Sequence, residues 1–173
     1  MGKFKYPNTY THNSELNTCS IHCYNYKGEE TGTVLIDDSD FNLVSSYQWH
    51  IEKSHSSVKY AQAILPNKKT LRLHNLLLPE SEQVDHINRD GLDNRRSNLR
   101  ACNNAQNNRN KIPTTNPRSG HVGIRFNERA GSYYVRIMVN KKEISLGHYA
   151  DLESAIAARK EGERRYFGEF NPE

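Results

Sequence analysis

The segment from residue 84 to residue 107 constrains this chain most, because it has the outline of a folded unit with almost no apolar content. Short strands are predicted at Val84–Ile87 and Asn98–Ala101, separated by ten loop-like residues. Asn103 is a favourable N-cap for a helix over 104–111. A strand–loop–strand–helix unit this polar would not form for packing alone, so we expect it to carry chemistry.

The composition limits the size of core that the chain can build. Hydrophobic residues make up 35% of the 173 residues, and asparagine occupies 19 positions. Burial must offset an ordering cost of roughly 1–2 kcal/mol per residue, so we expect small cores rather than one large core. The longest run of large aliphatic residues is Leu76–Leu78, and the N-terminus has no apolar stretch. A membrane span and a secretory signal are therefore not expected.

The net charge of +4 is concentrated in the middle of the chain. Residues 85–118 contain seven Lys and Arg against three Asp, and six of the seven cations are arginine. Guanidinium groups bind phosphate oxygens in a bidentate manner, so this excess indicates either a nucleic-acid surface or an ordinary solvated one. Residues 119–145 are also basic, whereas residues 146–173 carry four cations against six anions. We expect only the first of these two elements to face a polyanion.

The chain divides into four predicted regions. Residues 1–18 are polar without a period and are predicted to form an N-terminal arm. Residues 19–112 form a β-rich region, with the polar segment as its chemical core at 84–110. Residues 113–118 are a polar linker, and residues 119–170 are a separate module of three strands and a helix.

The predicted elements follow the local hydrophobic pattern and the turn residues. A short helix is predicted through Val44 after an N-cap among Asp37–Asp40, and a longer helix over Leu152–Tyr166 after an N-cap at Asp151. The predicted strands outside the polar segment are Cys19–Asn25, Thr33–Ile36, Gln48–Glu52, Val58–Ile64, Gly123–Phe126, Tyr133–Asn140 and Glu143–Gly147, with Leu71–Leu78 as a strand that runs into a helix.

Three side chains of the polar segment have the chemistry of a metal-dependent site. Asp85 offers a hard oxygen ligand, and Asn107 on the predicted helix offers another. His86 titrates near neutrality, which suits proton abstraction. Consecutive strand residues point to opposite faces, so Asp85 and His86 meet only where the strand end is twisted or bulged. For an Asp–His pair taken alone, a surface hydrogen bond is the alternative interpretation.

Residues 84–110 resemble the HNH nuclease motif, the ββα-metal finger of phage homing endonucleases, colicin DNases and some restriction enzymes. Asp85 and His86 fill the first pair of that motif. Asn98 follows His86 by 12 residues, and Asn107 follows Asn98 by 9. The arginine-rich string before the second strand and the asparagine-rich helix are most similar to the phage homing branch.

The resemblance implies a role for each matched residue. His86 is the general base that takes a proton from the attacking water, and Asn98 bonds across the loop and holds His86. Asp85 and Asn107 hold one divalent cation, Mg²⁺ or Mn²⁺, because the amide that replaces the motif's final histidine is a hard ligand. His74 matches a histidine that often precedes the motif. DNA contacts are assigned to Arg72, which with His74 is a candidate for the scissile phosphate, and to Arg89, Arg95, Arg96, Arg100 and Arg109.

Residues 119–170 resemble the APETALA2-type DNA-binding domain, a three-stranded antiparallel sheet packed on one helix. The similarity lies in Gly123–Arg125, Tyr134–Ile137, Leu146–Tyr149 and the alanine-rich helix. It implies that the sheet lies in the major groove of DNA, with the helix on the far side. The implied DNA-contacting residues are Arg125, Arg129, Tyr133, Arg136, Lys141 and Lys142. A phosphate clamp without base reading, or a salt bridge, is the alternative for the arginines.

The cysteines indicate a reducing compartment, since three of them show no disulfide framework. Cys19, His22 and Cys23 have the spacing of half a metal site, but alternation along this stretch favours a strand, and no second pair follows.

Taken together, the sequence predicts an α+β protein whose function is that of a divalent-metal-dependent DNA endonuclease of the HNH homing type. We expect double-stranded DNA as partner, no membrane, no small-molecule cofactor, a monomer or weak dimer that nicks one strand, and the host cell cytoplasm for a phage-encoded chain. A non-catalytic DNA-binding regulator on a nuclease scaffold and a restriction or structure-specific nuclease are the alternatives.

Overall fold

A computed structural model of the chain describes residues 5–52, 58–104, 106–107 and 120–170. It forms two compact units, Met1–Asn103 and Asn104–Glu173. Antiparallel sheets with a few short helices and one long helix confirm the predicted α+β class. The predicted linker at 113–118 lies outside the described residues. Among the described residues, no helix is long and apolar enough to cross a membrane.

The first unit begins with a three-stranded antiparallel sheet of β1 (Thr9–Asn13), β2 (Thr18–Tyr24) and β3 (Glu30–Asp37). Alternate residues of β2 and β3 face the core, as the sequence pattern predicts for half-buried strands. The side chains that this alternation buries completely are Cys19, Ile21, Cys23, Val34 and Ile36.

The prediction of an N-terminal arm over residues 1–18 is wrong for the part that forms β1. Thr9–Asn13 pairs with β2 in register, with His12 opposite Cys19. β1 is an edge strand whose side chains are mostly exposed, so its sequence lacks the apolar alternation that marks a strand.

A second small sheet and two short helices complete the core of the first unit. The sheet consists of β4 (His50–Ile51), β5 (Ala61–Ile64) and β6 (Thr70–Arg72). The helical segments are η1 (Asp38–Asp40), α1 (Phe41–Val44) and α2 (Leu73–Leu77), the last of which continues directly from β6 as predicted. Trp49 is fully buried at the centre of this core, where its indole N–H donates to the carbonyl of Val44 at 2.9 Å.

The polar segment forms a two-stranded hairpin of β7 (Gln83–His86) and β8 (Leu99–Cys102). These strands lie within one residue of their predicted positions, and η2 (Arg96–Asn98) leads into β8. The antiparallel register places Asp85 opposite Arg100. Helical residues follow at Asn104, Gln106 and Asn107, and they belong to the second unit.

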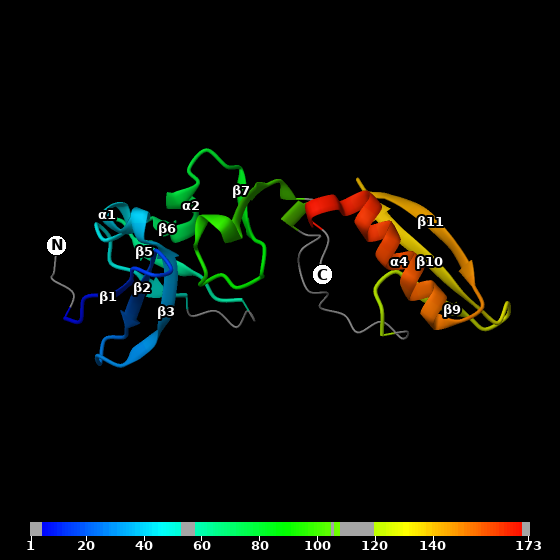
Figure 1. The fold of residues 1–173 in the computed structure, drawn as a ribbon, viewed down its shortest axis with the longest axis horizontal. Helices are drawn as coiled ribbons and strands as arrows, with labels where there is room; N and C mark the ends of the chain where they lie inside the picture. The colour runs from blue at the N-terminus through cyan, green and yellow to red at the C-terminus, as the bar shows by residue number, and fades with distance from the viewer. Residues whose placement is uncertain (1–4, 53–57, 105, 108–119, 171–173) are drawn as a thin grey trace. The chain divides into compact units, whose positions relative to one another are not determined.

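The second unit is a three-stranded antiparallel sheet, β11–β10–β9, with α4 (Leu152–Phe167) lying along one face, as Figure 1 shows. The strands are β9 (Ile124–Asn127), β10 (Ser132–Val139) and β11 (Lys142–Tyr149), and η3 (Gly168–Phe170) follows α4. The predicted N-cap is present, because an Asp151 carboxylate oxygen accepts from the Ser154 amide at 2.7 Å.

Gly162 allows α4 to lie close to the sheet. A Cβ atom at this position would lie 2.4 Å from a methyl group of Leu146, which is far inside contact distance. The sequence predicts only that this glycine weakens the helix by about 1 kcal/mol relative to alanine. The structure adds the compensating reason, since the bare glycine lets a leucine from β11 seat against the helix.

Candidate active site

β7 brings Asp85 and His86 into the interior of the first unit. Both residues are 5% exposed, which is unusual for neighbouring polar residues on a short strand. The β7–β8 pairing is regular through His86, so the two side chains leave the strand on opposite faces. Each face therefore needs its own set of partners to bury the polar group.

Asp85 is neutralised by an arginine from the partner strand. The Nε and Nη2 atoms of Arg100 donate to Asp85 Oδ2 at 2.8 and 2.7 Å. The side chains are 6% and 13% exposed, so this is a buried ion pair, and removing either partner would leave an uncompensated buried charge. Arg100 was expected to contact DNA, and in this structure its guanidinium binds the carboxylate predicted to be a metal ligand.

His86 lies between polar and aromatic neighbours. Its Nε2 atom is 3.3 Å from Asn94 Oδ1, and its ring centroid is 5.7 Å from that of Tyr60 and 5.1 Å from that of His74. Burial lowers the pKa of His86 below its ordinary value, against the opposing effects of the Asn94 hydrogen bond and the Asp85 charge. The imidazole is therefore neutral at pH 7 and has a lone pair to accept a proton.

His74 lies edge-on to His86 and is itself buried at the start of α2. Burial lowers the pKa of His74 to about 3, and the neighbouring His86 and Arg72 act in the same direction. A contact with the scissile phosphate stays a prediction. The His74 side chain that would make this contact is a neutral imidazole. The nearby cation is Arg72, which stacks over the Tyr60 ring at 5.0 Å.

Asn98 closes the loop that follows β7. Its amide nitrogen donates to Asn88 Oδ1 at 2.9 Å and to the carbonyl of Asp93 at 2.7 Å. Its amide oxygen accepts from the Asn88 backbone N–H at 2.9 Å. Asn98 is 7% exposed, so these bonds lie in an interior where they hold the loop firmly. The Asn98 side chain bonds Asn88 and Asp93, so its effect on His86 is indirect.

Two loop arginines that were assigned to DNA are engaged by carboxylates of the same unit. Arg95 is bidentate to Asp93 at 2.8 and 2.7 Å. Arg96 binds Asp40 through Nε and Nη2 at 2.9 and 2.7 Å, and its backbone N–H donates to Asp37 at 2.7 Å. Asp37 and Asp40 were predicted as a helix cap, but neither makes a side-chain cap hydrogen bond. Their carboxylates fasten the loop instead.

The remaining arginines of the region differ in their placement. Arg89 is half-buried in the loop after β7 and adopts a left-handed backbone conformation, with φ of 65°. Arg72 is exposed on β6 and lies 3.7 Å from Glu52. Arg109 lies outside the described residues, so its assignment to DNA stays a prediction.

The N-terminal sheet also holds this loop by its backbone. The Leu35 N–H donates to the carbonyl of Leu92 at 2.9 Å, and the Leu35 carbonyl accepts from the Asn94 N–H at 2.7 Å. The sequence predicts no specific role for Leu35 or for Asn94. The only sequence signal for Asn94 is its place in the polar stretch before η2. That stretch does not indicate which residue the Asn94 side chain will bond.

The sheet of the second unit presents one face to α4 and leaves the other open. Val135 and Ile137 of β10 are buried against the helix, whereas Tyr134 and Arg136 point away from it. On the open face Tyr134 pairs with Arg125 of β9 and stacks on His148 of β11, with ring centroids 4.9 Å apart. Arg136 forms an ion pair with Glu143 on the same face.

Tyr133 differs from the other predicted DNA contacts in this sheet. It packs against the cluster of Ile124, Val135 and Ala155, so it belongs to the helix side. Tyr134 supplies the aromatic ring of the open face. Arg129 lies in the turn after β9, and Lys141 and Lys142 are exposed where β10 turns into β11. A groove beside β9 is lined by Arg125, Arg129, Tyr134 and Arg136, among others.

Asn107, the second predicted metal ligand, is helical and half-buried in the second unit. Asp85 lies in the first unit, and its pairing with Asn107 in one site stays a prediction. The donor chemistry fits a hard divalent cation, because a carboxylate and an amide both offer oxygen.

A different group of potential metal ligands lies in the N-terminal sheet. His12, Cys19 and Asp38 place ligand atoms within 4.8 Å of one another, and His12 Nδ1 is 2.5 Å from Asp38 Oδ1. Cys19, His22 and Cys23, which have the spacing of half a metal site, do not face the same way. Cys19 and Cys23 face the core, whereas His22 faces outward and bonds Thr11 at 3.0 Å.

Comparison with known proteins places the candidate site within a described family domain. The family model described as HNH endonuclease matches residues 71–109, which run from β6 past β8 and include Asp85, His86 and Asn98. No curated protein and no solved structure matches the chain. The match supports an HNH nuclease that acts on DNA, a class that generally uses a divalent metal.

Proposed function

We propose that the chain is a divalent-metal-dependent DNA endonuclease of the HNH homing type, with His86 as general base. The observation that carries the proposal is a buried, neutral imidazole at the end of β7, inside the segment that matches the HNH family. A neutral base and an oxygen ligand are what hydrolysis of a phosphodiester by activated water requires.

The proposed mechanism divides the work among this chain's own side chains. His86 accepts the proton of the attacking water, and Asn98 keeps the surrounding loop closed through its three hydrogen bonds. Asp85 and Asn107 would hold the cation, and Arg100 forms an ion pair with Asp85. A bound Mg²⁺ or Mn²⁺ would stabilise the negative charge that develops on the phosphate and the leaving 3′ oxygen.

We further propose that the second unit supplies most of the DNA affinity through an APETALA2-like sheet. Its open face carries Arg125, Tyr134 and Arg136, while α4, which bears both acidic and basic residues, covers the other face. The arginines and the aromatic ring of the open face favour contact between the sheet and DNA. One active site per chain cuts one strand per encounter, so we expect a monomer to nick. A phage origin and location in the host cytoplasm follow from the homing assignment and belong to this proposal.

The test is relaxation of supercoiled plasmid by the full chain with Mg²⁺, with EDTA, and by the His86→Ala protein. The plasmid carries a library of candidate target inserts. We expect open-circle product that requires both the metal and His86, with DNA binding of His86→Ala within a few fold of wild type. A salt-sensitive gel shift without any product would contradict catalysis and favour a DNA-binding regulator on a nuclease scaffold.

A further inference from the structure

Asn94 is the most completely buried polar residue around the candidate base. It lies in the loop between β7 and β8 and is 0% exposed. Its Oδ1 atom is 3.3 Å from His86 Nε2, and its Nδ2 atom donates to the carbonyl of Gly91 at 3.3 Å. Both ends of the amide therefore have partners, and each end has a distinct one.

These two contacts fix which way the amide points. The Gly91 carbonyl can only accept a hydrogen bond, so it must face the NH₂ group of Asn94, and the amide oxygen must then face His86. That oxygen can only accept, so His86 Nε2 has to carry the hydrogen. In a neutral imidazole the remaining nitrogen, Nδ1, then holds the lone pair.

The backbone around Asn94 is held in place from two directions. Its N–H donates to the carbonyl of Leu35 on β3 at 2.7 Å. Gly91 is pressed against the segment before β5, where a Cβ atom would lie 2.3 Å from the Lys59 carbonyl and 2.6 Å from the Tyr60 ring. The side chain that faces His86 is therefore positioned by elements outside the loop itself.

We propose that Asn94 is a positioning residue that locks His86 in the Nε2–H tautomer and so makes Nδ1 the atom that takes the proton from water. The N-terminal sheet, through Leu35, is the platform for this lock. The inference rests on the proposed nuclease function for its catalytic meaning. The tautomer itself is a property of the folded chain and can be read without any cleavage.

The direct experiment is ¹⁵N-edited NMR of the imidazole side chains in the full-length, metal-free protein at pH 7.5. The His86 signals are assigned by their loss in His86→Ala. We expect the Nε2–H tautomer in wild type and a mixture of tautomers in Asn94→Ala. An Nδ1–H tautomer at His86 of the wild-type protein would overturn the proposal, and this outcome needs no variant to fold.

Two further variants separate positioning from general loosening of the loop. Asn94→Asp keeps an acceptor beside Nε2, loses the donor to Gly91 and adds a negative charge, so we expect Nε2 to keep its hydrogen and more of the imidazole to be protonated. Asn88→Ala removes loop hydrogen bonds without a bond to His86, and we expect the wild-type tautomer there too. A tautomer change in Asn88→Ala equal to that in Asn94→Ala would assign Asn94 a merely structural role.

Cleavage assays on the same proteins add the catalytic arm. We expect Asn94→Ala to lower kcat about 100-fold, toward the lower end of what a general base contributes, with little change in KM for DNA. Asn94→Asp should recover part of that loss at alkaline pH, where its His86 is neutral. If wild type shows the Nε2–H tautomer and does not cut DNA, the nuclease function fails while the lock stands. If wild type cuts but Asn94→Ala cuts equally well, the positioning role fails alone.

Discussion

At the residue scale, the neighbouring rings of His74 and His86 are kept uncharged by burial, and this makes the first unit sensitive to acid. The pKa of His74 is lowered to about 3 in the folded chain, against an ordinary value of 6.5, and the pKa of His86 is shifted in the same direction. Between pH 3 and pH 6.5, His74 binds a proton in the unfolded chain but not in the folded chain. The free energy of unfolding must therefore fall as the pH falls below about 6.5.

We predict that lowering the pH from 7.5 to 5 reduces the free energy of unfolding of the first unit by about 2 kcal/mol through His74, with a further loss through His86. Urea unfolding followed by Trp49 fluorescence measures it, because the chain's single tryptophan is buried in this core. The His74→Phe protein is the control and should lose less stability over this range. Equal pH dependence in the two proteins would contradict the effect assigned to His74.

At the element scale, a loop of polar residues is held rigid by contacts with the N-terminal sheet and η1. Arg96 bridges the loop to Asp40, which is only 6% exposed, and Leu35 adds two backbone hydrogen bonds. The arginine end is half-exposed, so the ion pair contributes modestly, on the order of 1 kcal/mol.

We predict that Asp40→Asn increases amide hydrogen exchange in residues 88–98 about fivefold, because loss of roughly 1 kcal/mol raises the open population by that factor. Exchange detected by mass spectrometry measures it. Asp38→Asn is the matched control, since Asp38 lies in the same turn but bonds His12. An equal increase in both variants would show that the turn, and not the bond to Arg96, controls the loop.

The sheet of the second unit gives another prediction at this scale. We expect Arg125→Ala to weaken DNA binding and to reduce the salt slope of log Kobs by about 0.9, the value for one lost phosphate contact. Arg164→Ala is the control, because Arg164 lies on α4, which covers the other face of the sheet. Its side chain bonds Glu161 at 2.8 Å. Fluorescence anisotropy over a salt series measures both. A larger loss for Arg164→Ala would place the DNA on the helix side.

How far the sequence predicts these elements depends on the range of the interactions involved. β2, β3, β7, β8 and α4 follow from alternation, turn residues and caps, which are local signals. β1 has no such signal, since an edge strand is held by its neighbour's backbone. The placement of Tyr133 on the helix side was predictable, because it shares its strand parity with Val135.

The partners within the site were less predictable than its members. Asp85, His86 and Asn98 stand out by type and spacing, but Arg96 meets Asp40 across 56 positions of sequence. Likewise, nothing local indicates that Arg100 binds Asp85 rather than DNA, or that Asn94 faces His86. These pairings depend on how the sheets pack and on cross-strand register, which residue spacing does not determine.

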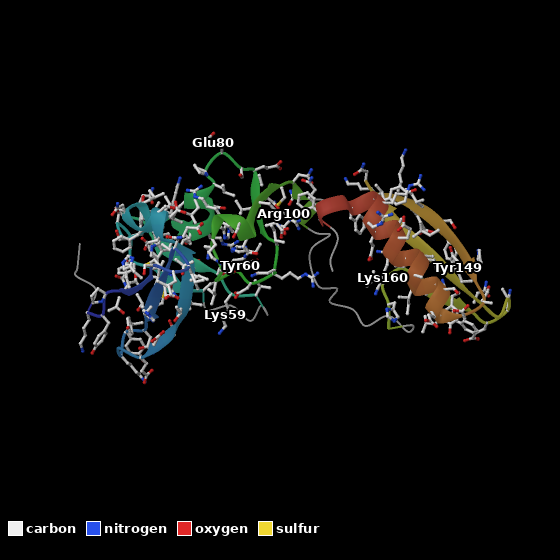
Figure 2. All side chains as sticks on the ribbon, in the orientation of Figure 1. Lys59, Tyr60, Glu80, Arg100, Tyr149 and Lys160 are labelled. Carbon is white, nitrogen blue, oxygen red and sulfur yellow. The ribbon has the colours of Figure 1, made fainter. Side chains whose placement is uncertain are left out.

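At the scale of the whole molecule, the first unit holds a candidate general base and the second an open basic sheet, so chemistry and DNA affinity are assigned to different units. Asn107, the second predicted metal ligand, belongs to the second unit. Figure 2 labels Arg100, the buried partner of Asp85, on the first unit, and Tyr149 and Lys160 on the second. The proposed function requires both units to act on one duplex.

The most direct test of this account is cleavage of a target duplex labelled separately on each strand, taken from an insert that the plasmid assay selects. Wild type and His86→Gln are compared with and without Mg²⁺. We predict a cut in one strand only, with a 3′-hydroxyl and a 5′-phosphate at the nick, which disappears without metal and falls at least 100-fold in His86→Gln. Cleavage by His86→Gln at the wild-type rate would contradict the central claim that His86 is the general base.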